Sequence, residues 1–97
     1  MAKKMTTAAG KRHLARVHEI PCVVCGANGV EAHHIREGQG MGQRAPDMLC
    51  AALCPECHRG PLGVHGDRSL MRIQKLDELD LVAMTLEKVF EIFEKRS

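Results

Sequence analysis

The sequence predicts a small α+β domain that is stapled by a metal ion, and three observations support this. Two Cys-x-x-Cys pairs, Cys22 with Cys25 and Cys54 with Cys57, supply four thiolates, which is enough for one tetrahedral zinc ion. A β-prone stretch surrounds the first pair, and apolar residues near the C-terminus recur at the three- and four-residue steps of an amphipathic helix. The 97 residues are expected to form one domain, because most independent domains hold about 100 to 150 residues.

The N-terminus predicts a basic arm. Residues 1–20 carry five basic residues against one acidic residue, whereas the remainder of the chain is slightly acidic. We expect residues 1–10 to form the arm and residues 11–97 to form a single domain. Such an arm suits a polyanion such as DNA, for which Lys11 and Arg12 are candidate contacts, or it is only a solvated leader.

A short helix is expected next, and it should end before the first cysteine pair. Thr6 or Thr7 can cap this helix, because a hydroxyl oxygen accepts a hydrogen bond from an unpaired backbone N–H. Gly10 disfavours the helical conformation and predicts that the helix starts late. Pro21 ends the helix because it has no backbone N–H to donate.

Residues 21–35 predict a pair of strands around the first cysteine pair, because an Ala-Asn-Gly turn separates two β-prone stretches. His33 and His34 fall at the end of the second stretch. Residues 38–43 are too rich in glycine for a regular element and predict a loop, which either drapes over DNA or is a disordered insertion. The apolar run at residues 48–53 restores order.

The C-terminal third predicts helices. Glycines and a proline between residues 58 and 66 rule out a long helix directly after the second cysteine pair. A short helix is expected at residues 69–74 and an amphipathic helix at residues 76–93, capped by Asp77. The longest apolar run has seven residues, against about 20 for a membrane span, so we expect a soluble protein with no membrane partner.

The cysteines favour structural zinc over disulfides or redox chemistry. We expect no secretory signal at the N-terminus, and no βαβ pattern accompanies either pair. The 28 residues from 26 to 53 separate the pairs, which is longer than the about 15–20 residues of a simple zinc ribbon and leaves room for a second feature. Cys50 belongs to neither pair and is expected to be a small buried apolar residue.

Histidines provide the candidate for that second feature. Four of the six flank the cysteine pairs: His33, His34, His58 and His65. An imidazole binds metal ions or takes a proton near neutral pH, so this clustering predicts a chemical role. His13 and His18 lie in the N-terminal segment and are expected to be surface or capping residues.

At these residues the chain resembles the HNH, or ββα-metal, nucleases. The run Ala32-His33-His34-Ile35 looks like their double-histidine strand, and Leu53-Cys54-Pro55-Glu56-Cys57-His58 looks like the zinc-braced variant. The resemblance is closest to small phage and prophage proteins related to the RecA-dependent Ref nuclease. It implies a ββα-metal core in an HNH-like nuclease domain, a location in the cytoplasm of a bacterial host, and DNA or a RecA filament on DNA as partner.

The resemblance also implies roles for individual residues. His34 matches the general base, and a catalytic ion, Mg²⁺ or Mn²⁺, is assigned to three positions: His33, His58 and His65. No asparagine occupies the middle position of the HNH pattern. Asp47 is assigned there, either to orient His34 or to bind the ion in place of one histidine. Further arginines are candidates for contacts to DNA phosphates: Arg36, Arg44, Arg59 and Arg68.

The expected function is therefore a metal-dependent DNA endonuclease that hydrolyses phosphodiester bonds, with structural Zn²⁺ and a second divalent ion as cofactors. One alternative is a non-catalytic zinc module that recruits DNA or a phage recombination or packaging complex. A zinc-ribbon adaptor with no DNA contact is a third reading, but it leaves His33 and His34 unexplained.

Overall fold

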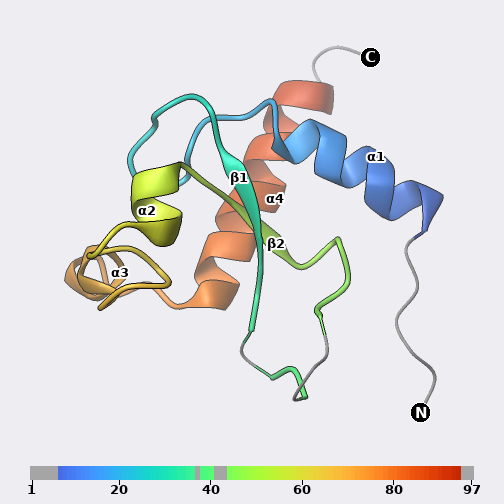
Figure 1. Cartoon of the computed structure of the whole chain (residues 1–97). Coiled ribbons are helices and arrows are strands. Elements are labelled where there is room, and N and C mark those ends of the chain that lie inside the picture. The colour runs from blue at the N-terminus through green and yellow to red at the C-terminus, as the bar shows by residue number, and fades with distance from the viewer. Residues whose placement is uncertain (1–6, 37, 41–43, 95–97) are drawn as a thin grey trace.

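A two-stranded antiparallel sheet lies at the centre of the fold, and helices precede and follow its strands along the chain (Figure 1). The computed structural model describes residues 7–36, 38–40 and 44–94. Its elements are α1 (Ala8–Val17), β1 (Glu31–His34), β2 (Cys50–Leu53), α2 (Pro55–Arg59), α3 (Ser69–Ile73) and α4 (Glu78–Glu94). The predicted α+β class is confirmed, and no helix in the described part of the chain is long and apolar enough to cross a membrane.

His33 and His34 are the last two residues of β1, as expected. In the register of the sheet Glu31 faces Leu53 and His34 faces Cys50. All four residues of β2 are buried, because α4 packs across this strand (Figure 1). The sheet is therefore fixed from behind by the long C-terminal helix.

The predicted strand pair within residues 21–35 is wrong. Residues 22–27 fold into a tight knuckle in which the backbone N–H of Cys22 donates to the oxygen of Ala27, at 2.8 Å. Gly26 donates back to the oxygen of Cys22 and has φ +82°, a conformation that glycine adopts without strain. The knuckle also bonds to β2, since the backbone N–H of Val23 donates to the oxygen of Ala52 at 3.0 Å, and β1 pairs with β2 instead.

The first helix starts earlier than expected. Thr7 caps it, since its side-chain oxygen accepts a hydrogen bond from the Gly10 backbone N–H at 2.9 Å. Residues 8–10 therefore belong to α1 and not to an arm, while residues 1–6 lie outside the described residues. Gly10 is tolerated because α1 approaches Asp47 closely: a Cβ at Gly10 would lie 3.1 Å from the Cβ of Asp47.

The C-terminal helices match the expectation. The helix predicted at residues 69–74 is α3, and the amphipathic helix predicted at residues 76–93 is α4. Asp77 caps α4 reciprocally with Asp80, since each backbone N–H donates to the other's carboxylate, at 2.8 and 2.9 Å. The predicted glycine-rich loop at residues 38–43 lies partly outside the described residues.

Candidate metal centres

The four paired cysteines form one cluster. Cys22 and Cys25 come from the knuckle, whereas Cys54 caps α2 and Cys57 lies within it. Their sulfur atoms lie within 4.8 Å of one another, and the Cys25 and Cys54 sulfurs are 3.6 Å apart. Thiolates that bind zinc at about 2.3 Å lie about 3.8 Å from one another in a tetrahedral site. The cluster can therefore hold one zinc ion, as its spacing predicts.

The electrostatics of the cluster favour a bound cation. Burial raises the pKa of the Cys22 thiol, but backbone N–H groups, led by that of Cys54, outweigh this effect and lower it to about 7. Burial and the neighbouring Cys54 thiol raise the pKa of Cys57. The pKa values of Cys22 and Cys57 therefore shift in opposite directions, and a bound cation would favour the thiolate form of both residues.

Cys50 stands apart from this cluster. It is fully buried in β2, and burial, followed by the negative charge of Asp47, raises the pKa of its thiol to about 11. A thiol that stays protonated among apolar neighbours behaves as a small hydrophobic residue, so the expectation for Cys50 is confirmed.

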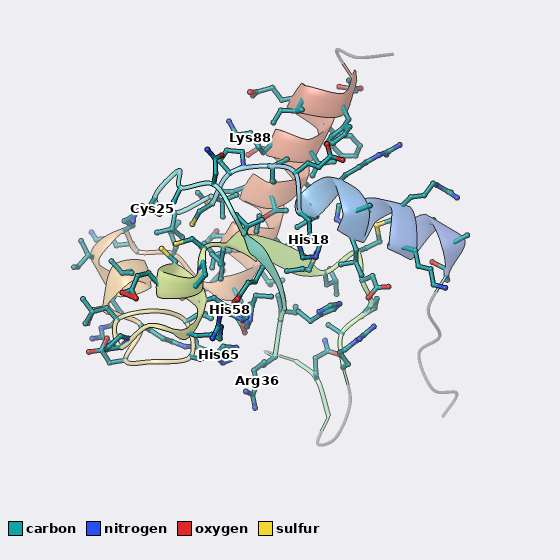
Figure 2. The ribbon with its side chains drawn as sticks, turned by 45° about the horizontal axis from the view of Figure 1, so that its top comes forward. His18, Cys25, Arg36, His58, His65 and Lys88 are labelled. Atoms are coloured by element: carbon teal, nitrogen blue, oxygen red, sulfur yellow. The ribbon has the colours of Figure 1, made fainter. Side chains whose placement is uncertain are left out.

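Three histidines form a second cluster, called here the histidine trio: His33, His58 and His65. One ring nitrogen of each lies within 4.8 Å of the others, and the ring centroids are 4.7 to 5.0 Å apart. Figure 2 shows His58 and His65 side by side, and their Nε2 atoms are 3.1 Å apart. Imidazoles that bind an ion at about 2.1 Å place their nitrogens about 3.4 Å apart, so the trio has the dimensions of a metal site.

The seven-residue spacing of His58 and His65 depends on a tight return of the chain. The backbone N–H of His65 donates to the oxygen of His58 at 3.0 Å, directly after α2 ends. A Cβ at Gly60 or Gly63 would lie 2.5 Å from a backbone oxygen of α2, and one at Gly66 would be closer still to Pro61. A side chain is thus excluded at all three glycines. The glycines allow the chain to turn back tightly, and this turn places His65 beside His58.

Glu31 supports His58 from β1. The Nδ1–H of His58 donates to the Glu31 carboxylate at 2.7 Å, which leaves Nε2 for the trio. Arg59 binds the same carboxylate through two nitrogens, at 2.9 and 2.5 Å. Arg59, followed by His58, holds the pKa of Glu31 well below its usual range, at about 2. A metal-bound imidazole commonly passes its second N–H to a carboxylate in this way.

Glu78 supports His33 in the same manner from α4. Its Oε2 accepts a hydrogen bond from the Nε2–H of His33 at 2.5 Å, and both side chains are almost fully buried. The backbone N–H of Arg36 donates to both carboxylate oxygens at 3.2 Å. Burial lowers the pKa of His33 and of His65, and the charge of His58 lowers both further, which outweighs Glu78 at His33. Both rings are therefore uncharged at neutral pH and have a lone pair to offer.

His34 lies apart from the trio, because successive side chains of a strand point to opposite faces. Its Nε2–H donates to the Oδ1 of Asp47 at 2.9 Å, which leaves Nδ1 free to accept a proton. Arg44 donates to the same Asp47 oxygen, also at 2.9 Å. Asp47 thus lies beside His34 and is not part of the trio.

A protein-family model matches residues 1–92 of the chain, and its description is protein of unknown function, DUF968. The chain belongs to the DUF968 family. No curated protein and no solved structure matches it. The matched part of the DUF968 chain contains the cysteine cluster, the histidine trio and the pair formed by His34 and Asp47.

The candidate DNA contacts of the DUF968 chain fall into three groups. Lys11 and Arg12 are exposed on α1, whereas Arg44 and Arg59 are bound to carboxylates of the site. Arg36 extends from the end of β1, below His65 in Figure 2. The positive charges of Arg36 and Arg68 both lower the pKa of His65, so these two arginines act on the trio electrostatically.

Sequence reasoning missed three polar residues of the DUF968 chain. Glu31 has a detectable signal, since it lies two positions before His33 and hence on the same face of β1. Glu78 has no local signal, because its partner His33 is 45 residues away. His13 was expected at the surface but is buried on α1, and its Nε2 has no hydrogen-bond partner among the described residues. His18 is exposed and is the C-cap of α1, as one of the two expectations for it had it, and its ring donates to the oxygen of Val30.

Proposed function

We propose that this DUF968 protein is a metal-dependent DNA endonuclease of the HNH type. The observation that carries the proposal is the histidine trio at the end of the strand whose last residue, His34, is paired with a carboxylate. Phosphodiester hydrolysis needs a base to activate water and positive charge to stabilise the phosphate. The two features together supply both requirements, from β1, the loop that follows it, α2 and the turn after α2.

The order of the elements supports a ββα-metal core. An antiparallel pair, β1 and β2, is followed directly by α2, which carries His58 in its last turn. The loop between the strands carries Asp47, where the HNH pattern has its middle residue. The zinc cluster lies at the start of α2 and would brace this core.

Ligand chemistry favours Mn²⁺ over Mg²⁺ at the trio. Mg²⁺ prefers oxygen ligands in a strict octahedral arrangement, and imidazole nitrogen suits the transition metals better. The trio offers three nitrogens, and its two carboxylates, Glu31 and Glu78, are turned toward histidine N–H groups. An ion held there would supply positive charge to the phosphate and to the departing oxygen.

His34 is the proposed base. With its Nε2–H fixed by Asp47, its Nδ1 takes the proton of a water molecule whose oxygen attacks phosphorus. The bond from phosphorus to the 3′ oxygen then breaks, and that oxygen takes a proton from solvent. Arg36 and Arg68, whose positive charges act on His65 of the trio, would bind phosphates of the same strand.

Nicking of supercoiled plasmid tests this function. Full-length, zinc-loaded protein is assayed with Mn²⁺ and with Mg²⁺, with and without RecA filaments on the DNA. We expect nicking with Mn²⁺, and His34→Ala should lose on the order of 10²-fold in rate while it keeps its zinc and its circular dichroism spectrum. His18→Ala, which changes an exposed histidine directly after α1, is the matched control and should keep full activity.

The opposite result is equally clear. If wild-type protein nicks no faster than His34→Ala under all of these conditions, the nuclease proposal fails. Retained binding to DNA would then favour the non-catalytic zinc module that recruits DNA.

A further inference from the structure

Glu78 is a carboxylate enclosed in the protein core. It is 1% exposed, it lies in the first turn of α4, and it touches the candidate metal site from a distant part of the chain. A buried ionised carboxylate is costly unless hydrogen bonds and opposite charge compensate it. Its presence here therefore requires a physical reason.

Three groups compensate the negative charge of Glu78. Its carboxylate accepts the Nε2–H of His33 and the backbone N–H of Arg36. Its position in the first turn of a 17-residue helix adds the positive end of the helix dipole. The carboxylate is thus held in one place, and His33 is held against it.

We propose that Glu78 is the positioning residue of the metal site. This inference rests on the proposed role of the histidine trio in binding an ion. By accepting the Nε2–H of His33, Glu78 fixes the tautomer that leaves the Nδ1 lone pair for the ion, and its charge makes the ring a stronger ligand. Glu31 has the same relation to His58, so two of the three imidazoles have a carboxylate behind them.

The packing of α4 makes Glu78 a rigid support. Thr85 lies about two turns after Glu78 on α4. Its hydroxyl oxygen accepts a hydrogen bond from the backbone N–H of Ala52 in β2 at 3.1 Å and donates to the oxygen of Leu81. This contact fixes α4 against the sheet that carries His33. The position of the metal ligand is therefore set by the docking of the C-terminal helix.

Cobalt binding tests the role of Glu78. Full-length protein with zinc in the cysteine cluster is titrated with Co²⁺, whose visible absorption reports binding at nitrogen ligands without the charge-transfer bands of thiolates. We expect Glu78→Gln, which keeps the size of the side chain and removes its charge, to weaken Co²⁺ binding by about 10- to 100-fold. His58→Ala removes a ligand and should abolish binding.

Glu91→Gln is the matched control, because it makes the same change of a carboxylate to an amide on the same helix, at a residue that pairs with Lys88 and not with a histidine. It should bind Co²⁺ like wild type, even if its stability falls. Glu78→Asp keeps the charge and provides a second variant if Glu78→Gln does not fold; the shorter side chain should also weaken binding.

Three results would overturn the inference. The first is wild-type affinity for Co²⁺ in both folded Glu78 variants. The second is a loss of binding as complete as that of His58→Ala, which would make Glu78 a ligand. The third is wild-type protein that binds no Co²⁺ at the trio. Protein that binds Co²⁺ as expected but does not nick DNA would defeat the proposed nuclease function and leave this inference standing.

Discussion

The Oδ1 of Asp47 lies 2.9 Å from the Nε2 of His34, and the side chain of Asp47 is only 4% exposed. Arg44 donates to the same oxygen, so one carboxylate of the loop between the strands ties an arginine to a histidine of β1. Gly10 allows α1 to lie against Asp47 from the other side. The orientation of His34 is therefore set by residues from two other parts of the chain.

Replacing Asp47 tests this arrangement. Asp47→Asn should lower the nicking rate by about 10-fold or more, because an amide no longer fixes the proton of His34 on Nε2. Arg44→Ala leaves the bond between Asp47 and His34 in place and should have the smaller effect. The two rates are measured in Mn²⁺ on the same plasmid, with zinc content as the check on folding. Equal rates for wild type and Asp47→Asn would show that Asp47 does not orient the base.

Removing one zinc ligand should unfold the protein. A core this small gains folding free energy from metal binding, so Cys54→Ser should lose its zinc and most of its far-UV circular dichroism. Cys50→Ala changes a buried cysteine outside the cluster and should keep about one zinc per chain. Elemental analysis and circular dichroism of both variants check this. A folded, zinc-free wild-type chain would contradict the prediction.

The exposed basic residues of α1 should contribute to DNA affinity without sequence preference. In the double variant Lys11→Ala with Arg12→Ala, the slope of log affinity against log salt should become shallower by up to about 2, since each phosphate contact contributes about 0.9 to this slope. Lys88→Ala is the control, because this lysine lies on α4 beside Glu91, at 3.5 Å. Fluorescence titrations of duplex DNA at several salt concentrations measure the slopes, and identical slopes would exclude α1 from the DNA contact.

Buried His13 should make the fold sensitive to acid. Burial, followed by the charge of Arg16, lowers its pKa below 6.5, while Asp47 opposes this shift. The unfolded chain then binds a proton more readily than the native one, so this group supports stability above about pH 6.5 and weakens it as the pH falls.

The measurement for His13 is urea unfolding at about pH 7.5 and about pH 5.5, on either side of the ordinary histidine pKa of about 6.5. His13→Leu should lose less stability between these two values than wild type, because the leucine side chain does not titrate. Comparing the two proteins cancels the acid sensitivity of the zinc cluster, which both share. The same loss in both would show that His13 does not govern the response.

Local signals in the sequence predicted much of this molecule. The caps Thr7 and Asp77, the periodicity of α4 and the spacing of the cysteine pairs each depend on residues within a few positions of one another. These local features can be recognised in the sequence without knowledge of the fold, and all of them are present in the structure.

Long-range relations were not predictable in the same way. The pairing of β1 with β2, and the bond between His33 and Glu78, join residues that the chain brings together only when it folds. Gly10 shows the same limit: its helix propensity predicted a late start, but the approach of α1 to Asp47 decided the outcome. The trio itself was expected from a resemblance, and its supporting carboxylates were not.

The return of the chain after α2 leaves a recognisable pattern in the sequence. From His58 to Gly66 the order is His-x-Gly-x-x-Gly-x-His-Gly, and each of the three glycines is a place where a side chain would strike the backbone. One inserted or deleted residue would carry the second histidine away from the first. Searching genomes for this nonapeptide behind a Cys-x-x-Cys pair should therefore retrieve chains that share the geometry of His58 and His65, even where the surrounding sequence has diverged.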